Sequence, residues 1–248
     1  MEEARSHRDP VIDRAFRLLG AFHEPAEALP LTSLAARAEL SKSTASRMTQ
    51  HLLACGALER TADGRFVIGL RLLEMASLAP RGHGLRATAL PFMQDLHHAT
   101  GQHVLLAVRD AGEAVLIERL SARRAGKVTY HVGGRLPLHP TGVGLVLLAF
   151  APAEVREQVL GGPLPVPEGA TPIDGRELRR YLAVVRRDTV ATNTRRLSEP
   201  MSSVAAPVFG PDRSVLAALS VIAPTDSFDP VGARPAVIAV ARAMSRAT

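Results

Sequence analysis

Apolar side chains recur with a helical period, separated by polar ones, over the first part of the chain. In residues 10–22 the apolar side chains recur every three or four positions, which predicts a helix whose first residue is Pro10. The apolar stripe of this helix consists of Ile12, Ala15, Phe16, Leu19 and Phe22. A second helix is predicted over 33–38, capped by the Thr32 hydroxyl and with Leu34 facing inward.

Residues 39–52, ELSKSTASRMTQHL, keep that helical period but divide into a mainly apolar face and a strongly polar one. The positions predicted to face inward are Ala45, Met48, Thr49 and Leu52. The opposite face carries hydroxyl groups, a guanidinium and an amide, on Ser43, Ser46, Arg47 and Gln50. Gly56 is a natural end for this helix, because glycine readily adopts the left-handed conformation found at helix C-termini. We therefore expect a third helix with a strongly polar outer stripe.

A hairpin is predicted directly after this third helix. Two short alternating runs in ALERTADGRFVIG are separated by residues 62–65, and Asp63-Gly64 between such runs is a strong hairpin signal. A further helix is predicted over 69–79, and the cluster PRGHG at 80–84 is the best domain boundary in the chain. Three helices followed by a hairpin predict a winged helix-turn-helix domain at 10–79.

The pattern after residue 84 predicts a second domain of a different kind, at 85–248. Helices are expected at 85–100, from a glycine-rich start at 140–144, and at 152–160, 174–187 and 232–246. Strands are expected on both sides of a turn at 110–112, at 127–132, and as a second hairpin over 202–223. Hairpins interleaved with helices favour an antiparallel sheet flanked by helices over a doubly wound sheet. The chain is therefore predicted to be an α+β protein of two domains.

Composition and charge narrow the functional classes. The 248-residue chain is 46% apolar and 22% charged, as in ordinary globular proteins, and no apolar run is long enough to cross a membrane. The N-terminus lacks the apolar stretch of a secretory signal, and a single cysteine excludes an internal disulfide framework, so we expect a cytoplasmic protein. The net charge of +6 suits a polyanionic partner. However, residues 1–80 carry 10 Lys/Arg and 10 Asp/Glu, so bulk charge alone does not select DNA.

The outer stripe of the third helix suits the reading of DNA. In a helix-turn-helix the second helix of the motif lies in the major groove, where short or flexible donors and acceptors contact base edges. The candidates for base contacts are Ser43, Ser46, Arg47 and Gln50. Lys42 and Thr44, at the helix N-terminus, can reach phosphates, and Arg65, at the hairpin tip, is expected to contact the DNA backbone or the minor groove. A merely solvated helix face would also be polar, but the three-helix context and the hairpin favour the DNA-binding interpretation.

Four stretches of the chain together match one known family in order and spacing. Residues 40–47 read LSKSTASR, which fits the pattern L-x-K-S-T-x-x-R that opens that family's recognition helix. The other three are HVLLAV at 103–108, GGRLPLHPTGVGLVLLA at 133–149 and VAAPVF…AALSV at 204–221. With these motifs the chain resembles the IclR-type bacterial transcriptional regulators over nearly its whole length. The resemblance implies a DNA-binding regulator whose C-terminal domain is GAF-like.

The resemblance also implies partners and an effector site. It implies a homodimer or homotetramer that binds a palindromic or repeated operator in double-stranded DNA, with repression as the commoner mode. A small metabolite in the GAF-like domain would change the spacing or order of the DNA-binding heads. The effector-binding positions carried over by motif are Val128, Gly142, Val143, Asn193, Ser203, Ser220 and Ile222. Independently of the family, the glycines of HPTGVG at a helix N-terminus suit a carboxylate, since free N–H groups there attract anions.

The chain departs from the family pattern at positions in both domains. Glu39 stands where the family usually has Gly in the helix-turn-helix turn, so that turn is expected to be built differently. Leu145 replaces a common Lys, Asn193 replaces an acid, and Ile222 replaces a residue that is polar in some members. These changes predict a less charged, more apolar pocket. They favour an aromatic or apolar acid as effector over a small oxoacid.

Other kinds of chemistry have weaker support in the sequence. The nine histidines lack Cys, Asp or Glu companions at ligand spacing, so neither a metal nor another cofactor is expected. Cys55 has no resolving partner, and we expect a small buried residue rather than a redox sensor. No P-loop, nucleophile elbow or nucleophile–base pair is present, so an enzyme with a GAF-like domain is a remote alternative. A nearer alternative is a DNA-binding regulator whose C-terminal domain only oligomerises and senses no ligand.

Overall fold

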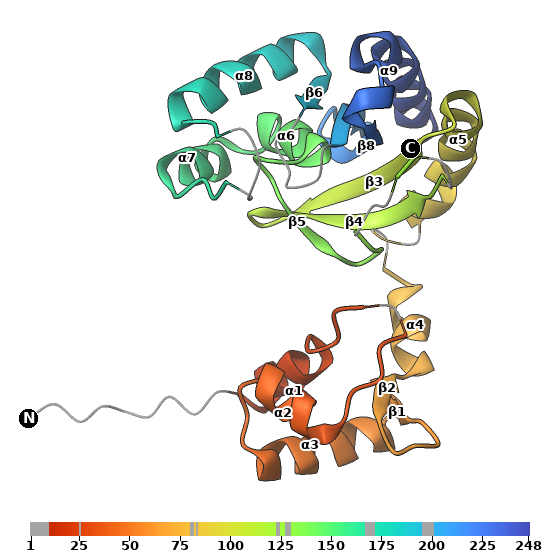
Figure 1. Cartoon of the computed structure of the whole chain (residues 1–248), viewed down its shortest axis with the longest axis vertical. Helices are drawn as coiled ribbons and strands as arrows, with labels where there is room; N and C mark the ends of the chain where they lie inside the picture. Colours follow the sequence, from red (N-terminus) through yellow and green to blue (C-terminus); the bar gives the residue numbers. More distant parts are fainter. Residues whose placement is uncertain are drawn as a thin grey trace, which may run out of the picture. The chain divides into compact units, whose positions relative to one another are not determined.

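The chain divides into two compact units, Met1–Ala79 and Pro80–Thr248 (Figure 1). The computed structural model describes residues 10–24, 26–79, 82, 84–122, 125–126, 130–166, 172–194 and 201–248. None of the helices in these described ranges is long and apolar enough to cross a membrane.

The first unit is a winged helix-turn-helix, as predicted. Its helices are α1 (Val11–Leu19), α2 (Leu31–Arg37), α3 (Lys42–Ala54) and α4 (Leu70–Ala76), and its hairpin pairs β1 (Leu58–Arg60) with β2 (Phe66–Ile68). The core side chains include Leu18, Leu34, Met48, Leu58 and Phe66, from three helices and both strands. A bridge between Leu29 and Phe66 ties the segment before α2 to the hairpin.

The turn between α2 and α3 keeps the geometry of a glycine turn although Glu39 occupies it. Glu39 has φ 53°, in the left-handed region that favours glycine. Its backbone N–H donates to Ala36 O (3.1 Å), and the N–H of Leu40 donates to Ala35 O (2.9 Å), which together form a Schellman motif. The expectation of a differently built turn is therefore wrong. The glutamate is accommodated by backbone strain instead.

Two further local predictions for the first unit are corrected by the structure. Helix α2 begins at Leu31 with Pro30 as its N-cap and no side-chain cap, so Thr32 lies inside the first turn and does not cap the helix. In the hairpin, the paired strands end at Arg60 and Phe66, so the loop spans residues 61–65. Gly64 has φ 83°, whereas Asp63 has a negative φ, so the turn is wider than a two-residue Asp-Gly turn.

Some apolar side chains of this unit lie on its surface. In α1, Leu18 is fully buried, whereas Ile12 and Phe16 are each 69% exposed. The apolar stripe of α1 is therefore only partly used by the core. Cys55 is also exposed, because it caps α3 beyond the last inward-facing position. The prediction of a buried Cys55 is wrong.

The second unit contains the predicted antiparallel sheet flanked by helices. Its strand order is β5-β4-β3-β8-β7-β6. The strands are β3 (His103–Asp110), β4 (Glu113–Leu120), β5 (Arg135–Pro137), β6 (Ala191–Thr194), β7 (Met201–Phe209) and β8 (Val215–Pro224). Helices α5 (Leu85–Thr100) and α9 (Pro230–Ala247) cover one face, and α6 (Gly142–Ala149), α7 (Ala153–Gly161) and α8 (Gly175–Asp188) lie on the other (Figure 1). A short 3-10 turn, η2 (Thr225–Ser227), follows β8.

The sheet separates two apolar layers, because neighbouring residues of a strand face opposite sides. On β3, Val104 and Leu106 pack with the α5 and α9 layer, while Leu105 packs with the α6 layer. Every residue of α6 is buried, and α8 covers it with its inward-facing side chains. These are Leu178, Leu182 and Val185. The N-terminus of α6 is therefore held inside the protein, against the sheet.

Two strands differ from the sequence prediction. Of the strand expected at 127–132, residues 127–129 lie outside the described residues and 130–132 form no strand. The edge strand is β5 instead, after Gly133, whose φ of 86° allows the chain to turn. At the other edge, β6 is absent from the prediction because its sequence, ATNT, has too few apolar residues to show a strand period.

Candidate functional site

The outer face of α3 exposes most of the predicted DNA-binding residues. Exposed side chains are Lys42, Ser43, Arg47 and Gln50, whereas Thr44 and Ser46 are half-buried. The inward face is buried as predicted, at Ala45, Met48, Thr49 and Leu52. The polar atom on that inner face is satisfied, because the Thr49 hydroxyl donates to Ser46 O (2.9 Å). The helix is thus fixed by its apolar side and leaves its polar side to solvent.

The first turn of α3 is held by its own hydroxyl groups. Ser41 is the N-cap, and its hydroxyl accepts from the Thr44 N–H (3.3 Å) and donates to the Thr44 hydroxyl (2.9 Å). The Ser43 hydroxyl lies 3.2 Å from that of Ser41. Lys42 therefore projects from an ordered turn at the positive end of the helix dipole, where an anion such as a phosphate is favoured.

The hairpin tip carries an ion pair. Arg65 Nε lies 3.1 Å from Asp63 Oδ2, and both side chains are more than half exposed. A hydrogen bond from the Thr61 hydroxyl, together with the charge of Arg65, holds the pKa of the Asp63 carboxyl below its usual range. Asp63 is therefore ionised at neutral pH and offsets part of the Arg65 charge. A phosphate contact by Arg65 has to compete with Asp63.

Two basic side chains near this surface are missing from the sequence-based set. His51 is exposed in the last turn of α3, four residues after Arg47 and therefore on the same side of the helix. Arg60 in β1 lies over the Phe66 ring, 4.9 Å from its centroid. The helical spacing could have identified His51. The position of Arg60 depends on the strand pairing, which the sequence pattern does not specify.

Strand register brings most of the predicted effector residues onto one face of the second unit's sheet. Asn193 of β6 lies opposite Ser203 of β7, and Ser203 lies opposite Ile222 of β8. Ile222 in turn lies opposite His103 of β3. Ser220, two residues before Ile222, shares its face. This face is the one that packs against α6.

A small cavity lies where this face meets the N-terminus of α6. It is lined by Leu105, Tyr130, Leu136, Thr141, Gly142, Val143, Ser203, Ser220 and Ile222. Five predicted effector residues therefore line it, while Val128 lies outside the described residues and Asn193 is beside Ser203 without lining the cavity. The free volume is about 10 Å³, room for roughly one water, whereas a cavity that binds benzene measures about 150 Å³. Any aromatic ligand has to open this cavity.

The start of α6 is packed tightly against β7. The Thr141 hydroxyl caps the helix by accepting from the Gly144 N–H (3.1 Å) and donates to Pro137 O (2.9 Å). A Cβ atom on Gly142 would lie only 2.4 Å from Ser203 Oγ. Glycine therefore permits the close approach of helix and strand, because a Cβ here would force the Ser203 hydroxyl to move. The approach places the positive end of the helix dipole at the cavity, which suits a carboxylate.

Polar atoms that line the cavity or lie next to it differ in whether they have a hydrogen-bond partner. The Ser220 hydroxyl donates to Val221 O (3.2 Å), so its own backbone provides a partner. Asn193 is 1% exposed, and its Nδ2 donates to Pro140 O (2.9 Å). Its Oδ1 is buried and has no hydrogen-bond partner within the described residues. A buried acceptor of this kind costs about 1–3 kcal/mol unless a partner is supplied.

Three hollows elsewhere on the described part of the second unit are larger, and two of them have no buried polar side chain in their lining. One, of about 410 Å³, is lined by Gly84, Leu85, Thr88, Val108, Val215, Leu216, Ala247 and Thr248. The other, of about 450 Å³, is lined by Arg109, Leu147, Phe150, Ala151, Pro152, Arg213, Ser214 and Val215. The third, of about 290 Å³, has a single buried polar side chain among its described lining residues, His139, and the Nε2 of this residue already lies 3.0 Å from Pro165 O. We therefore give more weight to the small cavity, because specific recognition depends on a few well-placed polar groups.

Histidines in the second unit have structural partners. His103 is buried; its Nδ1 accepts from the Ala122 N–H (3.1 Å), and its Nε2 lies 3.1 Å from Ala125 O and 3.0 Å from Gly126 O. His139 Nε2 lies 3.0 Å from Pro165 O. Within the part of the chain that the structure describes, no group of three or more His, Cys, Asp or Glu could hold a metal ion.

A winged helix-turn-helix with an exposed polar recognition helix, joined to a second domain with its own cavity, defines the class of DNA-binding transcriptional regulators. The chain belongs to the IclR family. The model of the IclR helix-turn-helix domain matches residues 11–62, and that of the bacterial transcriptional regulator IclR C-terminal domain matches residues 79–248.

Individual relatives are consistent with this assignment. The HTH-type transcriptional regulator XynR of Escherichia coli (strain K12) is 29% identical over 220 residues, which cover 88% of this chain and 87% of XynR. An IclR homolog from Microbacterium hydrocarbonoxydans, solved in complex with 4-hydroxybenzoate, is 33% identical with a TM-score of 0.87, covering 96% of this chain and 98% of that one. A putative IclR regulator from Silicibacter sp. has a TM-score of 0.82 at 26% identity, covering 96% and 95%. The homologues are transcriptional regulators and not enzymes.

Proposed function

We propose that the protein is a repressor in the cytoplasm that binds operator DNA through α3 and is modulated by a small aromatic acid bound at the α6 cavity. The observation that carries the DNA-binding half is the division of α3 into a buried apolar face and an exposed polar one. Arg47 and Gln50 can each make two hydrogen bonds to a base edge, and neither is used inside the protein's core. Lys42, Thr44 and Arg65 would then contact the phosphate backbone.

The effector half of the proposal is based on the polar groups around the cavity. The N-terminus of α6 attracts a carboxylate, while Leu105, Leu136 and Ile222 supply apolar walls for a ring. No charged side chain lines the cavity, which favours an aromatic acid over a small, highly charged oxoacid. The relative from Microbacterium hydrocarbonoxydans was solved with 4-hydroxybenzoate, a ligand of this class. We therefore propose Gly142, Val143, Ser203, Ser220 and Ile222 as effector contacts.

Assembly into a homodimer or homotetramer is part of the proposal. The first unit leaves large apolar side chains exposed on α1 and on the segment that contains α4. They are Val11, Ile12, Phe16, Leu70, Leu73, Met75 and Leu78. Apolar side chains exposed in such number on one small unit favour contact with another protein surface. A second copy of this chain would cover them and would pair two recognition helices for a palindromic or repeated operator.

The proposal is tested by DNA binding in the presence and absence of the acid. Fluorescence anisotropy would measure the affinity of the full-length protein for DNA from upstream of its own gene, with unrelated DNA of equal length as control. We expect preferential binding of the upstream DNA and at least a fivefold change in affinity with saturating 4-hydroxybenzoate or a related aromatic acid. Specific binding that no acid alters would favour a C-terminal domain that only oligomerises. Equal binding of both DNAs would contradict the DNA-binding half.

A further inference from the structure

Strand β6 is an edge strand held in place by the helix that precedes it. Helix α8 ends at Asp188, and β6 begins at Ala191, so only two residues connect them. Thr189 turns the chain with φ 54°, and its hydroxyl donates to Asp188 O (2.8 Å). Because β6 is the last strand of the sheet, its outer backbone groups have no strand to pair with.

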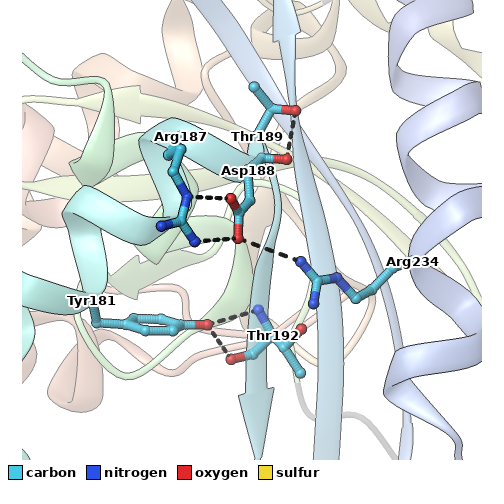
Figure 2. A network of polar contacts seen from close by, with 6 residues as sticks. All are labelled: Tyr181, Arg187, Asp188, Thr189, Thr192 and Arg234. Atoms are coloured by element: carbon cyan, nitrogen blue, oxygen red, sulfur yellow. Dashed lines mark hydrogen bonds and ion pairs between the residues drawn. The ribbon is translucent and has the colours of Figure 1, made fainter.

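The Tyr181 hydroxyl takes the place of that missing strand. It accepts from the Thr192 N–H (2.8 Å) and donates to the Thr192 carbonyl oxygen, so one side chain satisfies both backbone groups of this residue (Figure 2). In an antiparallel strand, the N–H and C=O of one residue both point to one edge of the strand, and those of the next residue point to the other edge. Since those of Thr192 point outward to Tyr181, those of Asn193 point inward to its partner Ser203. Tyr181 thus fixes the strand at the residue next to Asn193.

The unsatisfied oxygen of Asn193 has a defined chemical identity. Pro140 O can only accept, so the amide group facing it must be Nδ2, and the remaining atom must be the acceptor Oδ1. This oxygen is buried, and Asn193 itself is paired across the sheet with Ser203, a residue that lines the cavity. A neutral acceptor at this position pairs with a hydroxyl or amino group and repels a second acceptor such as a carboxylate oxygen.

We propose that Asn193 Oδ1 selects effectors that carry a hydrogen-bond donor, such as hydroxylated aromatic acids, and that Tyr181 is the positioning residue that holds Asn193 in place for this selection. The inference rests on the proposed function, because it concerns the same cavity. It goes further by naming a specificity-determining atom and a residue on α8 that acts on it without touching the ligand. When the cavity opens, the donor of the effector supplies the hydrogen bond that Asn193 Oδ1 lacks.

The ion pairs of Asp188, which belong to the same network, offer a matched control for the Tyr181 hydroxyl (Figure 2). Asp188 accepts from Arg187 Nε (2.7 Å), and Arg234 Nη2 lies 3.9 Å from Asp188 Oδ2. These charges hold the end of α8 but do not contact Thr192. They are also partly exposed, so each pair contributes little. Arg234→Ala therefore changes the same network without removing the hydrogen bonds to β6.

The test is calorimetric titration of the full-length protein with benzoate and with its three monohydroxylated isomers. For the wild-type protein we expect at least one isomer to bind tenfold or more tightly than benzoate. Tyr181→Phe keeps the ring but removes the hydroxyl, and it should reduce this preference to threefold or less while benzoate affinity changes less than twofold. Asn193→Leu should abolish the preference, and adding Tyr181→Phe to it should have no further effect. Arg234→Ala should retain the wild-type preference.

The possible results separate this inference from the function beneath it. If none of the four acids binds the wild-type protein, the proposed aromatic-acid effector is wrong and this inference fails with it. If an isomer binds and shifts DNA affinity but Tyr181→Phe keeps the full preference, the proposed function stands and the role of Tyr181 is refuted. If Tyr181→Phe weakens benzoate and the isomers equally, the residue supports the fold only, and the inference is again overturned. Thermal unfolding of each variant confirms that it is folded.

Discussion

The outer face of α3 and the cavity at α6 present their polar groups in opposite ways. On α3, Lys42, Arg47 and Gln50 are exposed and solvated, and no part of the first unit has to move to release them. At the cavity, the free volume is about 10 Å³ and Asn193 Oδ1 is buried without a partner in the described structure. The proposed DNA-binding surface is therefore preformed, whereas the proposed effector site must open to be used.

Under the proposed function, this difference indicates which part of the molecule would respond to a ligand. A ligand changes an equilibrium only if it binds one conformation better than another. A closed cavity meets this condition, because an aromatic acid can bind only the open form. Opening the cavity would require α6 or the strands that line it to move. Substitutions in each region test the contrast between a preformed surface and a site that must open.

Arg47→Ala should have the largest effect on operator binding. Loss of a guanidinium that reads a base edge is expected to weaken specific binding by about 1–3 kcal/mol. Affinity for unrelated DNA should fall much less, because a base contact contributes little there. Anisotropy titrations on both DNAs measure this difference. Equal losses on the two DNAs would identify Arg47 as a backbone contact.

Gly142→Ala should weaken effector binding and leave operator binding nearly unchanged. The added Cβ would lie 2.4 Å from Ser203 Oγ, so it is expected to fill or distort the cavity and weaken effector binding, with a stability loss of about 1–2 kcal/mol. Operator affinity without effector should stay within twofold of wild type. Gly161→Ala is the matched control, because a Cβ at Gly161 meets no atom within 4 Å. A Gly142→Ala protein that binds and responds to the acid normally would place the site elsewhere, for example in one of the larger hollows.

Lys42→Ala should have a smaller effect of a different kind. If Lys42 neutralises one phosphate, its removal should reduce the slope of log affinity against log salt concentration by about 1, on operator and unrelated DNA alike. Base preference should be unchanged. Titrations at four salt concentrations provide the slope. An unaltered slope would mean that Lys42 makes no phosphate contact.

Glu39→Gly should have the smallest effect, and it should stabilise the protein. Glu39 adopts φ 53°, a conformation that costs a non-glycine residue about 1 kcal/mol. Glycine removes this strain but increases the entropy of the unfolded chain, so the net gain is expected to be about 0.5 kcal/mol. Chemical denaturation, followed by a signal from the first unit, measures this gain in the free energy of unfolding. Operator affinity should be unchanged. A destabilised Glu39→Gly variant would show that the glutamate side chain has a role in the turn.

Structure that depends on neighbouring residues could be predicted from the sequence better than structure that depends on distant ones. The two faces of α3 follow from a helical period within one short stretch, and the structure confirms which residues of that stretch are buried. The lining of the cavity depends on the register of β3, β7 and β8 and on where α6 packs. Leu105, Tyr130, Leu136 and Thr141 are therefore missing from the sequence-based set. The family motif supplied Ser203 and Ser220, which periodicity alone could not distinguish from other buried strand residues.

Smaller errors have the same origin in tertiary context. The Leu29–Phe66 bridge precedes α2, whose start at Leu31 leaves Thr32 without a capping role. The ion pair between Asp63 and Arg65 reduces the positive charge available at the hairpin tip. The sequence shows both residues but does not show that their side chains meet. The short polar strand β6 is recognisable only by its pairing with β7. In each case a partner distant in sequence, or the exact path of a loop, determines the result.

The most direct test of the account is the base preference of the recognition helix itself. Binding-site selection from a randomised DNA pool should be performed with the wild-type protein and with the Arg47→Ala/Gln50→Ala double variant, at moderate salt. We expect the wild type to select a repeated or palindromic sequence, and the double variant to lose preference at a few defined base pairs in each half-site while still binding DNA. An identical selected sequence from both proteins would contradict the claim that the outer face of α3 reads DNA.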